Sequence, residues 1–165
     1  MNEKVNFGST KVLKTKKTKL VSDIFSSVSN KYDLMNDAMS LGLHRLWKER
    51  LYVVSKLKKS DNVLDLATGT GDIALKFLSK RKSIKITCLD ENQEMLDICK
   101  DRLIDNGFVK DVTFIKRSAE NAKLEENQYT LATIAFGFRN FTDHSKALKN
   151  IYNSLMPGGR LIIME

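Results

Sequence analysis

The chain has 165 residues, enough for one domain with a sizeable buried core, and its formal net charge is +8. No apolar run approaches the ~20 residues of a membrane-spanning helix, and no signal peptide or repeat is visible. Cys88 and Cys99 lack the spacing of a metal site, so we expect reduced core thiols in a soluble, intracellular protein. The basic excess permits attraction to nucleic acid or to an anionic membrane, although Lys-rich surfaces are usually only solvated.

The first sixty residues predict helices behind a basic segment. Residues 1–19 are polar, with six lysines against the single acid Glu3, and predict a loosely held, flexible basic arm. Apolar residues then recur at helical spacing and predict three helices, over residues 20–29, 32–39 and 44–57. We expect residues 20–60 to form a helical lid over the open end of a sheet. The third helix would carry one apolar face, made of Leu46, Trp47, Leu51, Val54 and Leu57.

The stretch from Asn62 to Ala74 organises the rest of the chain. A short apolar run is followed by a turn with Gly69 and Gly71, and a helical pattern begins at once. Glycine permits positive φ and lets backbone N–H groups approach a ligand closely. Strand, glycine turn and helix open a doubly wound α/β domain, whose ligands lie at the carboxyl ends of its strands. Such a turn can also merely join a strand to a helix.

The remaining segments alternate between strand and helix patterns. The expected strands are residues 62–66, 84–89, 112–115, 129–136 and 161–164, and the expected helices are residues 72–79, 92–103 and 144–155. Pro157-Gly158-Gly159 predicts the turn into the last strand. The fold class is therefore α/β and Rossmann-like, with a mostly parallel sheet of five strands in a core over residues 61–165.

Two acids indicate which nucleoside ligand the turn would bind. Gly69-x-Gly71-x-x-Ala74 formally matches the dinucleotide fingerprint, but Asp65 fits poorly beside a pyrophosphate and suits a cationic group. S-adenosylmethionine (SAM) carries an α-ammonium group and no phosphate. Asp90 ends the second strand at about the separation from the turn at which an acid meets a ribose diol. NAD and SAM both contain ribose, and Asp90 could instead cap the helix that begins near Asn92.

Three blocks of residues are more specific than the glycine turn, and a short match at Asn6-Phe7-Gly8 precedes them. The blocks are Phe25-x-x-Val28-x-x-x-Tyr32-Asp33-x-Met35-Asn36-Asp37-x-Met39-Ser40-x-Gly42-x-His44-Arg45-x-Trp47-Lys48, Leu64-Asp65-Leu66-Ala67-x-Gly69-Thr70-Gly71-Asp72 and Phe136-Gly137-x-Arg139-Asn140-x-x-Asp143. Over nearly its whole length the chain resembles the ubiquinone/menaquinone biosynthesis C-methyltransferases, a family of class I SAM-dependent methyltransferases.

The resemblance implies a SAM site. Its expected cofactor-binding residues are Asp65, Gly69, Thr70, Gly71, Asp90, Ser118, Ala119 and Ala135. Thr70 would lie in the turn, Asp90 on the ribose, and Ser118 and Ala119 beside the adenine. Ala135 stands where the family commonly has Ser, so one hydroxyl contact with SAM is lost. No metal is expected.

The resemblance also implies C-methylation of a polyprenylated hydroquinone, either a naphthoquinol or a benzoquinol. Such a reaction needs a group that stabilises the phenolate of the substrate or removes its proton, near the methyl group. Arg139 is our first choice of catalytic residue, with a surface ion pair as the alternative. Asp143 is better explained as a helix cap and His44 as a packing residue. Tyr32 and Asp33 could line the quinol site.

A quinol with an isoprenoid tail lies in the bilayer, so we expect a bacterial cytoplasmic protein that works at the inner membrane face. The basic arm would bind anionic lipid there. Other enzymes of quinone biosynthesis are expected partners.

Two alternatives stay open. The last expected strand ends at Glu165, whereas the family continues with a further helix and its last two strands, so the chain could be a truncated, inactive methyltransferase that still binds SAM. A nucleic-acid methyltransferase is a weaker alternative, because nothing interleaves aromatic and basic residues for base stacking.

Overall fold

The computed structural model describes residues 4–7, 10–13, 43–81 and 83–165, with side chains from residue 46 onwards. Its first two ranges form an antiparallel hairpin, β1 (Lys4–Phe7) and β2 (Thr10–Leu13). The sequence analysis did not predict a hairpin within the basic arm over residues 1–19, and the loose attachment of that arm stays a prediction. Val5 and Phe7 alternate with polar residues before Gly8-Ser9, and Val12 and Leu13 follow it, which is a hairpin signal that the count of lysines obscured. The helices expected over residues 20–29 and 32–39 lie outside the described residues.

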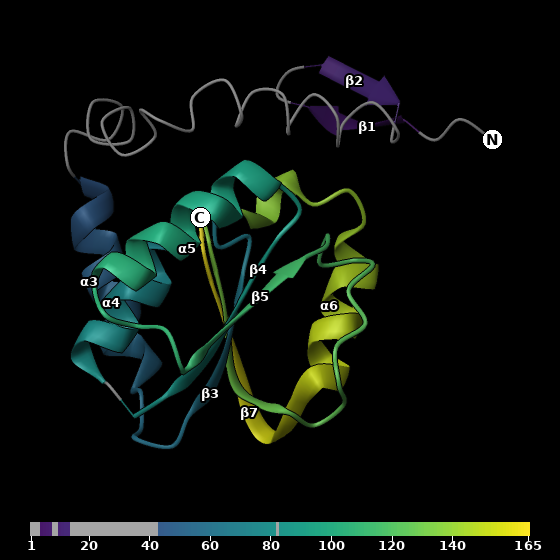
Figure 1. The fold of residues 1–165 in the computed structure, drawn as a ribbon. Coiled ribbons are helices and arrows are strands. Elements are labelled where there is room, and N and C mark those ends of the chain that lie inside the picture. Colours follow the sequence, from purple (N-terminus) through teal and green to yellow (C-terminus); the bar gives the residue numbers. More distant parts are fainter. Residues whose placement is uncertain (1–3, 8–9, 14–42, 82) are drawn as a thin grey trace.

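The core is a parallel sheet with the strand order β5-β4-β3-β6-β7 (Figure 1). Its strands are β3 (Asn62–Leu66), β4 (Lys85–Asp90), β5 (Val112–Lys116), β6 (Tyr129–Ala135) and β7 (Leu155–Met164). The central strands are apolar almost throughout because both of their faces are covered. The predicted α/β class and the five-stranded parallel sheet are confirmed.

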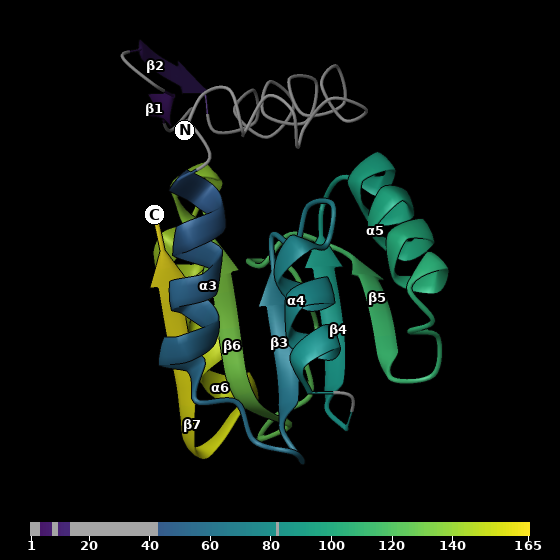
Figure 2. The same ribbon diagram turned by 90° about the vertical axis from the view of Figure 1, so that its left-hand side faces the viewer.

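Helices cover both faces of this sheet (Figures 1 and 2). One face carries α3 (Leu43–Ser55), α4 (Asp72–Lys80) and α5 (Gln93–Asp105), and the other carries α6 (His144–Ser154). Each face has its own buried cluster. Phe77, Leu78 and Leu103 belong to the first cluster, and Leu66, Ile134 and Ile151 to the second. The sheet is thus the middle of three layers.

Helix α3 differs from its predicted apolar face. Leu51 and the following Leu57 are buried, but Leu46, Trp47 and Val54 are 66%, 45% and 45% exposed. Among the described elements α3 lies against β7 and α4 (Figure 2), and these contacts leave the three side chains partly exposed. The helix exists where the sequence predicted it, and its docking leaves part of the predicted face uncovered.

The last strand begins earlier than expected. Strand β7 starts at Leu155, beside Tyr129, and regular pairing with β6 resumes from Arg160 after a shift of register. The predicted turn lies within this irregular stretch, and Gly158 has φ +79 there. The strand extends through the turn because Leu155 pairs with β6 before it and Arg160 pairs with β6 after it.

Strand β3 is the point where the order of the sheet reverses. It pairs with β4 on one side and with β6 on the other, although β6 follows much later in the chain. The connections that leave β3 and β6 therefore separate at their carboxyl ends. Open α/β sheets bind ligands in the crevice formed there.

Candidate functional site

The turn after β3 takes a left-handed backbone at three positions. Ala67, Gly69 and Gly71 have φ of 49°, 55° and 82°. A Cβ on Gly71 would lie 2.4 Å from the Sγ of Cys99, so glycine is needed where α4 begins against α5. Ala67 has a Cβ at such a position, at a cost of about 1–2 kcal/mol. The backbone is thus held strained at the expected ligand site.

Two adjoining hollows lie at the carboxyl ends of the strands. The first hollow, of about 730 Å³ with open solvent included, extends from the turn over the ends of β4 and β5. The second hollow, of about 410 Å³ on the same measure, lies between the turn and α3. Both are lined by the same four residues, Ala67, Gly69, Ala135 and Phe136. One elongated ligand can therefore occupy both.

Asp90 lies in the first hollow. Its carboxylate accepts hydrogen bonds from the backbone N–H of Gly69 at 2.8 Å and of Asn92 at 2.9 Å. Burial raises the pKa of Asp90 above its usual value, although these N–H groups oppose the shift. The cap of α5 is Asn92, whose Oδ1 accepts from the N–H of Met95. Asp90 is therefore not the helix cap, and its remaining lone pairs can accept from a diol.

The far end of the first hollow is acidic. Ser118 and Ala119 line it as expected, together with Glu91 and Glu120. Burial, with the nearby charges of Glu120 and Asp90, raises the pKa of Glu91 to about 7. Glu120 is buried and accepts from the N–H of Thr142 at 2.7 Å. This end offers hydrogen-bond acceptors, which suits a ligand with exposed N–H groups.

Asp65 lines the second hollow and is only 1% exposed. It accepts hydrogen bonds from the hydroxyls of Thr68 at 2.6 Å and Thr133 at 2.8 Å. Burial raises the pKa of Asp65 to about 6, even though both hydroxyls act to lower it. A cation bound beside this carboxylate would offset the burial cost. The site therefore fits an ammonium group.

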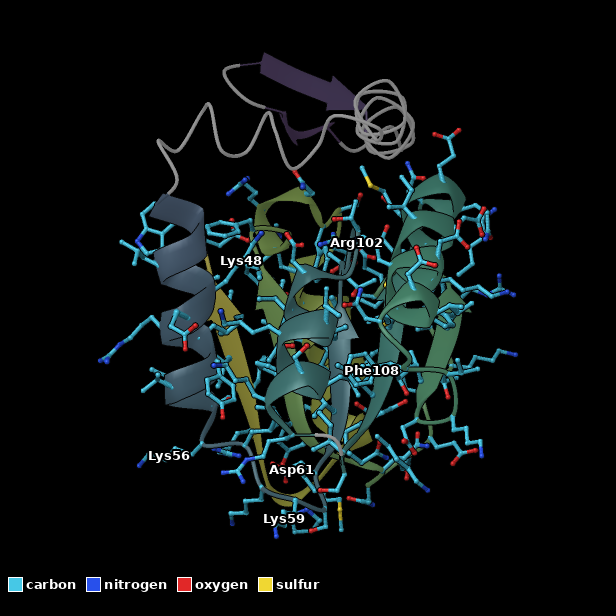
Figure 3. The ribbon with its side chains drawn as sticks, turned by 60° about the vertical axis from the view of Figure 1, so that its left-hand side comes forward. Lys48, Lys56, Lys59, Asp61, Arg102 and Phe108 are labelled. Atoms are coloured by element: carbon cyan, nitrogen blue, oxygen red, sulfur yellow. The ribbon has the colours of Figure 1, made fainter. Side chains whose placement is uncertain are left out.

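The start of α4 is held from two sides by cations (Figure 3). Lys48 of α3 forms an ion pair with Asp72, and the Nη1 of Arg102 of α5 lies 2.9 Å from the same carboxylate. Arg102 also donates to the carbonyl and hydroxyl oxygens of Thr70, each at 3.0 Å. Burial would raise the pKa of Asp72, but Lys48 and Arg102 outweigh it, and the pKa is lowered. This network fixes the turn around Thr70.

The connection after β6 forms the wall that both hollows share. Phe136 has φ +58, and its ring lies 5.7 Å from the ring of Trp47, centroid to centroid. A Cβ on Gly137 would lie 2.5 Å from the Cβ of Ala67, so the two connections meet at van der Waals distance. The wall therefore depends on close packing between segments far apart in the chain.

Arg139 belongs to this connection but does not line either hollow. Its Nη1 donates to Glu165 at 2.7 Å, and its side chain is 62% exposed. The surface ion pair that the sequence left open as an alternative is thus present, and a catalytic role for Arg139 stays a prediction. Asp143 caps α6 by accepting from the N–H of Lys146 at 3.0 Å, as expected.

The structure brings most of the predicted cofactor-binding residues to the two hollows, and their contacts with SAM stay predictions. Gly69 and Ala135 line both hollows, Asp90, Ser118 and Ala119 line the first, and Asp65 and Thr70 line the second. Gly71 lines neither, and its visible role is packing. The sequence reasoning assigned no role to Lys48, Asp72, Glu91 or Glu120. Glu91 directly follows Asp90, and this position in the chain is the signal that could have predicted it as a site residue. Tyr32 and Asp33 lie outside the described residues, and His44 outside the described side chains.

Comparisons with known proteins agree with this geometry. The ubiE/COQ5 methyltransferase family matches residues 11–165. The ubiquinone/menaquinone biosynthesis C-methyltransferase UbiE of Francisella tularensis subsp. novicida (strain U112) is 43% identical over 99% of this chain and 66% of its own length. The chain thus spans about two thirds of that curated relative.

Solved structures resemble the fold. A SAM-dependent methyltransferase from Aquifex aeolicus has a TM-score of 0.63 at 26% identity, over 70% of this chain and 62% of its own. Another, from Geobacter sulfurreducens in complex with S-adenosyl-L-homocysteine, has a TM-score of 0.61 at 23% identity, over 70% of this chain and 46% of its own. The Rossmann-like fold is confirmed. No helix among the described residues is long and apolar enough to cross a membrane.

Proposed function

Because the chain belongs to the ubiE/COQ5 methyltransferase family, we propose that it catalyses the SAM-dependent C-methylation of a polyprenylated hydroquinone in ubiquinone or menaquinone biosynthesis. The family resemblance drawn from the three sequence blocks is confirmed by the match over residues 11–165. The names of the curated relatives state a C-methyltransferase of ubiquinone/menaquinone biosynthesis, which supports this proposal.

The observation that carries the proposal is the placement of two acids around one turn. Asp65 lines the second hollow and Asp90 the first, at the ends of adjacent strands, and Gly69 lies in both linings. SAM has an ammonium group at one end and a ribose diol near the other, which match a buried carboxylate and a carboxylate with spare lone pairs. In the lining of the first hollow Arg117 is outnumbered by the carboxylates of Asp90, Glu91 and Glu120, so a pyrophosphate fits it poorly.

When bound, SAM supplies an activated methyl group on a sulfonium sulfur. The protein must hold the acceptor carbon in line with that methyl group and exclude water. Phe136 lines both hollows, and its ring lies 5.7 Å from the ring of Trp47, so the two rings form one aromatic surface. Such a surface suits the flat ring of a quinol.

Deprotonation of the acceptor phenol would make the neighbouring ring carbon nucleophilic, so a cation near that oxygen would assist. We retain Arg139 for this role. Its ion pair with Glu165 is exposed, so exchange for a phenolate costs little. Its position directly after the shared wall supports the assignment.

The isoprenoid tail of the substrate implies work at a membrane surface, and we propose a bacterial protein held peripherally at the inner membrane face. The lysines of residues 1–19 would bind anionic lipid. Deleting residues 1–19 should weaken binding to liposomes that contain anionic lipid and reduce its dependence on salt. Unchanged binding would remove this part of the proposal.

Two measurements test the proposed function. Isothermal titration should show binding of SAM and no binding of NADH, which would instead indicate a dinucleotide enzyme. Methyl transfer from labelled SAM to a demethylated quinol in detergent should then give the methylated quinol. SAM binding without any transfer would favour the second candidate, a methyltransferase that has kept only its cofactor site.

A further inference from the structure

We propose that Lys48 binds the carboxylate at the amino acid end of SAM, so that helix α3 selects donors with an intact α-amino acid. This inference rests on the proposed function, because it assigns one end of the ligand proposed there.

Lys48 lines the second hollow. Its side chain is only 13% exposed, and it shares the lining with Asp65 and Thr70. No other residue that the structure places in this lining carries a positive charge. Figure 3 shows Lys48 on the side of α3 that faces the start of α4. A mostly buried cation on the wall of a hollow is costly unless it meets negative charge.

The charges of the hollow match an α-amino acid. Asp65 accepts hydrogen bonds from two hydroxyls and has no cation among its described hydrogen-bond partners. An α-ammonium group would supply that cation, and the ligand's carboxylate would then need one of its own. Lys48 lies in the same lining and fits that need. A zwitterion held between Asp65 and Lys48 brings no net charge into the hollow.

The existing partner of Lys48 does not prevent this role. Asp72 pairs with Lys48, but Arg102 also reaches Asp72, at 2.9 Å. A lysine ammonium has three donors, so Lys48 can turn one toward a ligand and keep another on Asp72. Arg102 would continue to compensate the charge of Asp72 while this happens.

The test compares ligands that differ only at the amino acid end. S-adenosylhomocysteine keeps the ammonium and carboxylate groups, its decarboxylated analogue keeps only the ammonium group, and 5′-methylthioadenosine keeps neither. Isothermal titration of Lys48→Gln should show about tenfold to hundredfold weaker binding of S-adenosylhomocysteine than the unmodified chain. Binding of the other two ligands should change by less than about threefold, because a carboxylate is absent from both. Lys48→Arg, which keeps the charge, should retain most of the affinity.

Lys76→Gln is the matched control. Lys76 of α4 pairs with Glu49 of α3 at 2.6 Å, so it also joins these helices, but it lies outside the lining of the second hollow. Its substitution should leave all three affinities unchanged. Equal losses for all three ligands in Lys48→Gln, or equal losses in Lys76→Gln, would show that the lysines act only through helix docking and would overturn the assignment.

The outcomes also separate this inference from the proposed function. If the unmodified chain binds S-adenosylhomocysteine and Lys48→Gln binds it equally well, Lys48 has no such role and the proposed function stands. If the unmodified chain binds none of the three ligands, the proposed function is wrong and this assignment falls with it. Should Lys48→Gln fail to fold, a melting curve would reveal it, and the affinity of Lys48→Arg for S-adenosylhomocysteine then decides. A strong loss of that affinity in Lys48→Arg would contradict the assignment, because the proposed role of Lys48 needs only a positive charge.

Discussion

The two hollows of the site are built in different ways. The first hollow depends on residues directly after β4 and β5, and the carboxylate of Asp90 is held by backbone N–H groups of Gly69 and Asn92. The second hollow depends on a helix from another part of the chain, because Lys48 enters it from α3. The nucleoside end of the proposed ligand would thus contact residues at the ends of the strands. Its amino acid end would contact a surface that is complete only when helix α3 packs against the rest of the domain.

The acids of the two hollows also differ in the groups that hold them. Burial raises the pKa of both Asp65 and Asp90, but Asp90 is opposed by backbone donors and Asp65 by the hydroxyls of Thr68 and Thr133. Hydroxyls can rotate and can accept as well as donate, whereas backbone N–H groups cannot. Of these two acids, Asp65 is therefore the one whose charge state should respond more to a ligand.

The largest effect is expected from Asp90→Asn. Loss of charge-assisted hydrogen bonds at the ribose should weaken binding of both S-adenosylhomocysteine and 5′-methylthioadenosine by about a hundredfold, or about 3 kcal/mol. Isothermal titration measures both, with Glu94→Gln, an exposed change in α5, as the control. A loss confined to S-adenosylhomocysteine would contradict the assignment of the ribose to the first hollow.

Asp65→Asn should have a smaller and more selective effect. Binding of S-adenosylhomocysteine should weaken by about tenfold to a hundredfold, since the ammonium group loses its carboxylate partner, and 5′-methylthioadenosine should be unaffected. The same titrations check this. Equal weakening for both ligands would mean that Asp65 supports the turn rather than the ligand.

The pH dependence of binding follows from the raised pKa of Asp65. Its pKa is about 6, against an ordinary value of 3.8, so the carboxylate that binds a cation is lost as pH falls below about 6. Affinity for S-adenosylhomocysteine should fall by up to about tenfold per pH unit below that point, and less steeply where other groups compensate. Asp65→Asn should abolish this slope. In the ligand-free protein the sign is opposite: the folded state binds the proton more tightly, so this group's contribution to stability falls as pH rises from about 4 to about 6.

A change at the shared wall should affect stability more than binding specificity. Gly137→Ala would push a Cβ against that of Ala67 and should destabilise the fold by about 1–3 kcal/mol in urea unfolding. Ala67→Gly removes the opposing Cβ, so the double variant should recover most of the loss. If Gly137→Ala is equally harmful in both backgrounds, the contact between the two connections is not its cause.

The smallest effect on stability is expected from Arg139→Gln. An exposed ion pair contributes about 0–1 kcal/mol, so the melting temperature and the affinity for S-adenosylhomocysteine should hardly change. Methyl transfer should nevertheless fall by about tenfold or more if Arg139 stabilises the phenolate. Lys146→Gln, a change on the exposed side of α6, is the control. Undiminished methyl transfer would remove Arg139 from the proposed mechanism.

The sequence by itself determined the parts of the site that are local in the chain. Apolar periodicity and turn residues locate strand ends, which is why Asp65 and Asp90 were predicted there and do line the hollows. The same reasoning placed Asp143 as a helix cap, because caps depend on neighbours three residues away. The family resemblance added Ser118 and Ala135, which line the hollows as well.

Only the tertiary structure decided what depends on contacts between distant segments. The docking of α3 left Leu46 exposed and brought Lys48 into the second hollow, and β7 brought Glu165 to Arg139. An amphipathic pattern states that a helix has an apolar face, but not how much of that face its neighbours cover. Helix packing and ion pairs across the chain are set by the assembled layers, and no local pattern encodes them.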